Sequence, residues 1–410
     1  MQLRTDAQTI IQEAIRRVQP GAAVRRALQS ANLSGRVHLV AIGKAAWPMA
    51  SAAYEALGET ITDGVVITKY GHSCGAIGAL KIFEAAHPVP DESSYTATRA
   101  AMELVAPLGE GDTVLFLVSG GGSALFECPR IDEAQMQDVT QQLLACGADI
   151  VEMNTIRKRL SNVKGGRFAE LAAPAKVFSI VLSDIIGDPL DMIASGPAYP
   201  DSSTCEEAMQ IVRKYDLKLS AAAMACLAGE TPKALSNVET HVTGSVRELC
   251  AAAQETAQAL GYTCQLLTDC LACQAREAGS FLASLAKTHA DTKTSLAFLA
   301  GGETVVRLTG KGLGGRNQEL ALAAAPGIAG LPDTAVFSFG SDGTDGPTDA
   351  AGGYVDGRTE EKLRACGLRT AEVLQENDSY HALKKVDGLI VTGPTGTNVN
   401  DLAMVLIRRA

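Results

Sequence analysis

The feature that most constrains the fold is a short apolar run that ends in a glycine-rich turn. Residues 115–118 are Leu-Phe-Leu-Val, which predicts a buried strand, and Ser119-Gly120-Gly121-Gly122-Ser123 follows directly. Because glycine has no Cβ, such a turn exposes backbone N–H groups at the C-terminal edge of a sheet, where open α/β sheets bind ligands. Those groups suit phosphate or carboxylate oxygens. The alternative is a tight strand-to-helix turn that binds nothing.

Short apolar runs alternate with helical patterns along the first half of the chain. Expected strands in this half lie at 37–43, 64–68, 81–86, 113–118 and 177–182. This alternation predicts an α/β fold with a mostly parallel sheet covered on both faces.

A second alternation begins near residue 241. Its expected strands lie at 262–267, 294–300, 303–309, 334–339 and 388–392. The stretch Gly229-Glu230-Thr231-Pro232 is the best linker candidate. We therefore expect two α/β domains, residues 1–232 and 233–410, with a cleft between them.

Composition narrows the classes of partner. The 410 residues carry a formal net charge of -10, which argues against nucleic acid and anionic membranes as partners. No apolar run reaches 18 residues, and the first residues lack the apolar core of a signal peptide. The ten cysteines show no disulfide framework, so we expect reduced thiols in a cytoplasmic protein.

Two sets of basic residues are candidates for binding an anion. Lys44 follows Gly43 at the end of the first expected strand, although Ala45 replaces the Ser/Thr of a P-loop. The densest positive cluster is 157–159, Arg-Lys-Arg, with Lys164 and Arg167 beyond it. A solvated surface is the alternative for both sets, but the strand end beside Lys44 and the glycine pair after Lys164 favour ligand contact.

Carboxylates gather in two loops. Asp184, Asp188 and Asp191 follow the expected strand 177–182, and this clustering suits a Mg²⁺ site or a general base, with turn capping as the alternative. The glycine-rich stretch 340–353 carries three more aspartates, but it departs from the EF-hand pattern.

A third pattern, Gly310-x-Gly312-x-x-Gly315, lies between an expected strand and an expected helix. That is the context of a dinucleotide-binding turn, and Asp342 after the next strand is the candidate ribose ligand. The motif favours a nicotinamide enzyme, although by itself it is weak.

Taken together, these segments resemble the class II glycerate kinases, or glycerate 2-kinases, whose C-terminal portion is the MOFRL domain. The resemblance runs from about residue 8 to the C-terminus. It rests on the segments 43–45, 119–125, 164–167, 183–197, 301–304, 314–319, 342–346 and 395–398.

The resemblance implies a Rossmann-like N-terminal domain, a smaller MOFRL domain and an active site in the cleft. It implies transfer of the ATP γ-phosphoryl group to the 2-hydroxyl of D-glycerate, with Mg²⁺. The partners would be these small molecules, and a homodimer is one candidate state.

The site residues that we assign fall into three groups. Lys44 and Arg316 would stabilise charge, with Asp188 or Asp191 as the base. The substrate and nucleotide ligands would be Ser119, Gly120, Gly121, Gly122, Ser123, Lys164, Asn317, Thr397 and Asn398. The Mg²⁺ holders would be Glu303, Asp342 and Asp345.

Two rivals belong to other classes. The family was formerly named hydroxypyruvate reductase, so an NAD(P)H-dependent reductase that uses the turn 310–315 is the main alternative. A non-catalytic protein that binds sugar acids is the second.

Overall fold

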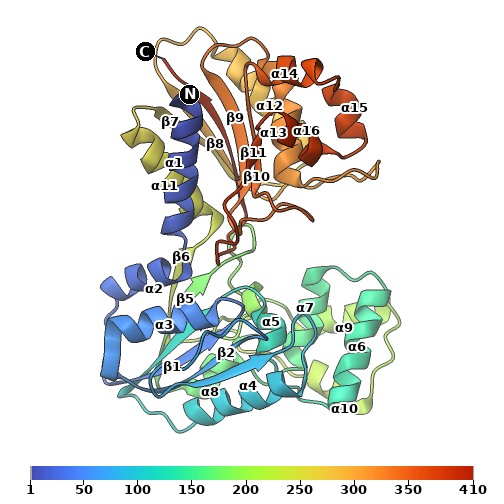
Figure 1. The fold of residues 1–410 in the computed structure, drawn as a ribbon. Coiled ribbons are helices and arrows are strands. Elements are labelled where there is room, and N and C mark those ends of the chain that lie inside the picture. Colours follow the sequence, from blue (N-terminus) through green and yellow to red (C-terminus); the bar gives the residue numbers. More distant parts are fainter. Residues whose placement is uncertain (1, 410) are drawn as a thin grey trace. The chain divides into compact units, whose positions relative to one another are not determined.

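The computed structural model describes residues 2–409, which divide into two compact units (Figure 1). The parallel-sheet unit comprises Ala23–Leu182 and Asp188–Thr243. The mixed-sheet unit comprises the segment up to Ala22, Ser183–Gly187 and the chain from Gly244 onward.

This division differs from the expected boundary at 232/233, and the N-terminal helix is one reason. The helix α1 (Gln2–Arg17) packs against α11 (Val246–Ala259), and Ile10, Ile11 and Ala14 are buried in one core with residues of α11. Burial of this apolar stripe joins the start of the chain to its last part.

The parallel-sheet unit contains six strands in the order β3-β2-β1-β4-β5-β6. Their bounds are β1 Arg36–Ile42, β2 Ile61–Lys69, β3 Lys81–Ala85, β4 Asp112–Val118, β5 Lys176–Leu182 and β6 Val238–Gly244. The pairs β1–β2, β2–β3, β1–β4 and β4–β5 are all parallel. The strand order reverses between β1 and β4, and such a switch point is where doubly wound sheets bind ligands.

Helices cover both faces of this sheet (Figure 1). The helices α2 (Pro20–Gln29) and α3 (Ala46–Leu57) share a core with β1 and β4 on one face. On the other face Phe168 of α8 (Arg167–Ala172) packs against Phe116 of β4, with 4.9 Å between the ring centroids, and α4 (Glu92–Val105) lies beside α8. A separate core joins α6 (Glu133–Ala145), α7 (Ile150–Arg159), α9 (Cys205–Lys214) and α10 (Ala221–Leu227). The expected mostly parallel, doubly covered sheet is confirmed.

The mixed-sheet unit contains a second six-stranded sheet, in the order β11-β10-β9-β12-β8-β7. The bounds are β7 Thr263–Leu271, β8 Leu296–Gly302, β9 Thr334–Gly340, β10 Gly352–Asp356, β11 Leu389–Ile390 and β12 Asp401–Ile407. The pair β7–β8 is parallel, whereas β12 runs antiparallel to both β8 and β9.

Helices also cover both faces of the second sheet (Figure 1). The helices α1 and α11 lie on one face, and α12 (Ala275–Thr288) and α13 (Arg316–Ile328) lie on the other. Three short helices follow β10: α14 (Thr359–Ala365), α15 (Thr370–Gln375) and α16 (Ser379–Lys385).

Two expectations for this sheet were wrong. Residues 303–309 form no strand, since only Val305 pairs, in an isolated bridge with Gln274. Val305 and Leu308 are instead 59% and 79% exposed. Conversely, β10 begins at Gly352 in what we took for a loop, and glycine is a poor predictor of strand. No helix within residues 2–409 combines the length and apolar character needed to span a membrane.

Candidate active site

The glycine-rich turn lies beside the end of β1, at the switch point of the parallel sheet. The Lys44 N–H donates to the Gly120 carbonyl at 2.9 Å, and the Ala45 N–H donates to Ser119 Oγ at 3.1 Å. Gly43 has φ +111°, and a Cβ there would come within 2.4 Å of the Ser119 carbonyl oxygen. Glycine is therefore required at 43 for the two strand ends to meet. The structure brings together Lys44 and the 119–123 turn, as the sequence predicted.

Lys44 is exposed, and its ammonium group forms no ion pair within residues 2–409. Gly121 has φ +85°, and a Cβ on it would lie 3.2 Å from Cγ of Lys44. An unneutralised cation thus lies beside a turn that a side chain would obstruct. This arrangement suits an anionic ligand.

Lys164, a predicted ligand, is fully buried beneath the turn rather than exposed on it. Its Nζ donates to the carbonyls of Ser123 and Phe126 at 2.8 Å each, and it lies 3.2 Å from Oε2 of buried Glu127. Burial lowers the pKa of Lys164 to about 8, against the opposing charge of Glu127. The ammonium group of Lys164 is thereby engaged by two carbonyls and one carboxylate of the protein, so its contacts are those of a residue that positions the turn. Direct ligand contact by Lys164 stays a prediction.

The hydroxyl of Ser123 is oriented by Ser195, which lies in the motif segment 183–197 but was given no role, and through it by Asn154, which no motif contains. Ser195 Oγ lies 2.9 Å from Ser123 Oγ and donates to Asn154 Oδ1 at 3.0 Å. Ser195 and its neighbour Ala194 have φ +62° and +52°, which is strained for residues with a Cβ. Asn154 belongs to no recognisable motif, so only the fold could have found it.

The two candidate bases occupy different environments. The Asp191 carboxylate lies 3.2 Å from Nζ of buried Lys158, which also lies 3.1 Å from buried Asp201. Asp188 has φ +51°, and its Oδ1 is buried without a hydrogen-bond partner within residues 2–409. A buried carboxylate oxygen without a donor is costly unless a ligand or water serves it. The structure does not choose between the two residues.

In the mixed-sheet unit, Arg316 is the centre of a second polar cluster. Its guanidinium forms a bidentate pair with Asp401 at 2.5 and 3.1 Å, and Nη1 lies 2.8 Å from Glu303. Burial opposes the charge of Arg316, but hydrogen bonds to Asp401 outweigh it and raise the pKa of the guanidinium. Asp401 was not assigned to the site because the sequence places it at the end of a polar loop, whereas the structure makes it the first residue of β12.

Asp345 caps the helix that Arg316 begins. Its two carboxylate oxygens accept the N–H groups of Asn317 at 3.1 Å and Gln318 at 2.8 Å. Burial raises the pKa of Asp345 from the ordinary value of 3.8 to about 6, although these N–H groups oppose the shift. The Asn317 side chain is also buried and accepts a hydrogen bond from Ser338.

The remaining predicted site residues lie in loops of the same unit. Thr397 Oγ1 donates to the carbonyl of Val18, the residue after α1, at 2.8 Å, so its hydroxyl is used within the protein. Asn398 is exposed, and Asp342 accepts the Thr344 N–H at 2.9 Å.

No group of three or more His, Cys, Asp or Glu side chains within residues 2–409 is arranged to hold a metal ion. Mg²⁺ is usually held by only one or two carboxylates, with phosphate oxygens and waters completing its shell. Glu303, 44% exposed, and the half-buried Asp342 fit that demand. Asp345 does not, since both its oxygens cap α13.

The Gly310–Gly315 segment borders a pocket of about 590 Å³ that also includes Glu303 and Arg316. Its glycines serve close packing against another loop. A Cβ on Gly310 would come within 2.3 Å of the Glu376 backbone, and one on Gly312 within 2.5 Å of Asp378. Since no strand precedes this segment, the strand–turn–helix context of a dinucleotide motif is missing.

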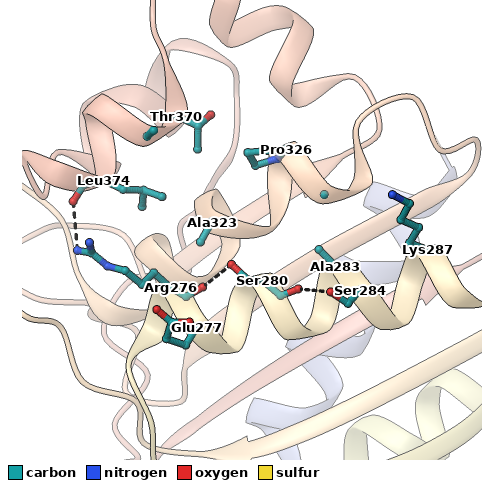
Figure 2. A pocket seen from close by; sticks show the side chains of 12 residues that line it. Arg276, Glu277, Ser280, Ala283, Ser284, Lys287, Ala323, Pro326, Thr370 and Leu374 are labelled. Atoms are coloured by element: carbon teal, nitrogen blue, oxygen red, sulfur yellow. Dashed lines mark hydrogen bonds between the residues drawn. The ribbon is translucent and has the colours of Figure 1, made fainter.

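A further pocket, of about 540 Å³, lies between α12, α13 and α15 (Figure 2). At one end of the pocket Arg276 donates to the Leu374 carbonyl at 3.2 Å (Figure 2). The Nε atom of Arg276 also lies 3.1 Å from Glu319. None of the predicted site residues lines this pocket.

These features define a two-domain α/β protein that carries a glycine-rich turn beside an exposed lysine on one domain and an arginine–carboxylate cluster on the other. Family models match at residues 6–228, as a domain of unknown function (DUF4147), and at residues 296–401, as the MOFRL family. A Thermotoga maritima protein named D-glycerate 2-kinase is 53% identical over 404 residues, covering 97% of each chain. The chain belongs to the glycerate 2-kinase family with a C-terminal MOFRL domain.

Two further comparisons bear on fold and activity. A crystal structure of a Thermotoga maritima glycerate kinase matches with a TM-score of 0.95 and 52% identity, covering 99% of each chain. An Agrobacterium vitis relative, 40% identical over 91% of this chain and all of its own length, is provisionally named a hydroxypyruvate reductase.

Proposed function

We propose that this protein is a kinase that transfers the γ-phosphoryl group of ATP to the 2-hydroxyl of D-glycerate, with Mg²⁺ as cofactor. The observation that carries the proposal is the pairing of Lys44 with the Gly120–Gly122 turn at the β1/β4 switch point. The full-length similarity to a D-glycerate 2-kinase supports it.

Each set of residues has a part in this reaction. Phosphoryl transfer depends on positioning and on positive charge directed at the transferring oxygens. Lys44 and Arg316 supply that charge, and Ser119–Ser123 supplies amide and hydroxyl donors. Asp188 or Asp191 accepts the proton of the acceptor hydroxyl, and Asn317, Thr397 and Asn398 complete the binding loops.

Bound Mg²⁺ would neutralise charge on the phosphate oxygens. Among the predicted holders, Glu303 and Asp342 are the best placed to supply an oxygen. The interdomain location of the active site and the oligomeric state stay predictions. We also infer a cytoplasmic protein, which is consistent with ten free cysteine thiols.

The test is turnover by the purified protein. We would incubate it with ATP, Mg²⁺ and D-glycerate and couple the product to enolase without adding a mutase. An enolase signal supports both the kinase reaction and attack by the 2-hydroxyl. Release of ADP without that signal would mean that another hydroxyl accepts the phosphoryl group.

The reductase alternative is tested separately, with NADH, NADPH and hydroxypyruvate. We expect no oxidation of either nicotinamide, because the Gly310–Gly315 segment lacks its preceding strand. Oxidation together with no ADP release would overturn the kinase assignment.

A further inference from the structure

Three basic side chains that no motif singled out lie beside Lys44, at the C-terminal edge of the parallel sheet. Lys69 is the last residue of β2, His72 follows it in the β2–β3 loop, and His87 follows the end of β3. Because β1, β2 and β3 are adjacent and parallel, their C-terminal ends meet at one edge.

His87 is placed toward the glycine-rich turn. A Cβ on Gly121 would lie 3.1 Å from the His87 ring and 3.2 Å from Lys44 Cγ, so the ring and the lysine stem flank the same glycine. His87 makes no hydrogen bond or ion pair within residues 2–409. Its ring nitrogens are therefore available beside the exposed amides of the turn.

The charges at this edge are mutually repulsive. Burial lowers the pKa of His87, and the nearby charges of Lys44, Lys69 and His72 lower it further. His72 is held in place because its Nδ1 donates to the Lys44 carbonyl at 3.1 Å. Neither Lys44 nor Lys69 has an ion-pair partner within residues 2–409, although the protein as a whole carries a net charge of -10. The carboxylates of Glu84 and Asp91 lie at the same strand ends, but they accept the backbone N–H groups of Ser73 and Ala86 and, among the described residues, form no ion pair with these cations. Binding of an anion among the cations would therefore reduce their mutual repulsion.

We propose that Lys69, His72 and His87, together with Lys44 and the amides of Gly120–Gly122, form the binding site for an oxyanion of one substrate. The oxyanion is either the carboxylate of the hydroxy acid or a phosphate group of the nucleotide. The proposal rests on the kinase function, and it adds three side chains to the binding set.

The single tryptophan provides a local reporter of this site. Trp47, in the first turn of α3, donates its indole N–H to the Gly75 carbonyl at 2.9 Å and so links α3 to the loop that carries His72. Ligand binding at this edge should change its fluorescence.

The test is calorimetric titration of the full-length protein with D-glycerate, with ADP and with inorganic phosphate, followed in parallel by Trp47 fluorescence. We expect His87→Gln and Lys69→Gln each to weaken one of these ligands about tenfold, the effect of losing one charge-assisted hydrogen bond. If only the affinity for D-glycerate falls, the bound oxyanion is the carboxylate of the hydroxy acid. If the affinities for ADP and inorganic phosphate fall, the bound oxyanion is a phosphate group of the nucleotide.

Lys81→Gln is the matched control. Lys81 begins β3 at the opposite edge of the same strand pair, where it lies across from Val65, whereas Lys69 lies across from Ala85. The affinities of Lys81→Gln for D-glycerate, ADP and inorganic phosphate should equal those of the native protein. Equal affinities in all four proteins, with unchanged melting temperatures, would overturn the inference.

Two further readouts separate this inference from the function itself. D-glycerate keeps its charge between pH 6 and 8. If the native protein binds D-glycerate more tightly at low pH, and this pH dependence is smaller in His87→Gln, the difference reports the protonation of His87. Weakened binding without any turnover would support the anion site and reject the kinase. Normal turnover with unaffected binding would reject the anion site alone.

Discussion

The two units differ in whether the basic residue at their strand ends is paired with a carboxylate. In the parallel-sheet unit, Lys44 is exposed and without a counter-charge. In the mixed-sheet unit, Arg316 is held by Asp401 and Glu303. Parallel strands all end at the same edge of a sheet, so the turns that follow them lie together there. In the mixed sheet β12 runs antiparallel to β8, so the first residue of β12, Asp401, lies opposite the end of β8 and places a carboxylate at that edge.

The difference teaches that similar glycine-rich loops can serve two purposes. At Gly43 and Gly121 the missing Cβ opens space between strand ends and around a cation. At Gly310 and Gly312 it admits the backbone of a neighbouring loop. Substitutions in the two units should therefore have different effects on activity and on stability.

Lys44→Ala should have the largest effect. The loss of an unpaired cation directed at the substrate should lower kcat/KM about 10³-fold, as for other groups that stabilise transition-state charge. Because the side chain is exposed, the melting temperature should not change. Lys81→Ala, an exposed lysine of the same sheet, serves as control, and near-normal kinetics of Lys44→Ala would remove Lys44 from the site.

Arg316→Met should affect activity and stability together. We expect kcat/KM to fall about 10²-fold and the free energy of unfolding to fall by about 3 kcal/mol, because Asp401 is left as a largely buried, unpaired carboxylate. Urea unfolding measures the second effect. Adding Asp401→Asn should restore most of the stability without restoring activity; recovery of both would mean that Arg316 is only structural.

Lys164→Met should act on the parallel-sheet unit through positioning. The substitution removes the nearer cation of the buried Glu127 carboxylate, at 3.2 Å, and leaves only Arg157 at 3.9 Å, so we expect a loss of about 3 kcal/mol in unfolding free energy. A loosened turn should lower kcat about tenfold. The double variant with Glu127→Gln should regain stability, and if its kcat also returned fully, the carbonyl contacts of Lys164 would be irrelevant to the turn.

Asp345→Asn should have its clearest effect on the pH dependence of stability. The folded protein raises the pKa of this carboxyl from 3.8 to about 6 and so binds its proton more tightly than the unfolded chain does. The native protein should therefore lose stability relative to the variant as the pH rises from about 4 to about 6. Parallel curves of unfolding free energy against pH would contradict the shift.

The periodicity of apolar residues and the positions of the glycines in the sequence predicted the fold class and the family of this protein. The alternation of apolar runs with helical patterns predicted the doubly covered parallel sheet, because burial on both faces makes a strand uniformly apolar. The motif set also predicted the family, and it placed Lys44 and the 119–123 turn in a common site.

Only the tertiary structure decided which side chains meet. Four residues of the candidate sites belong to no local sequence motif, and their positions depend on which strands are neighbours: Glu127, Asn154, Asp401 and His87. The run 303–309 has the apolar character of a strand, yet it pairs only at Val305, in an isolated bridge with Gln274, and otherwise lies in a loop. The sequence assigned Lys164 as a ligand contact, but packing buries it beneath the turn. Local sequence encodes propensity and burial, whereas strand order and the pairing of distant charges arise from long-range contacts that no short motif records.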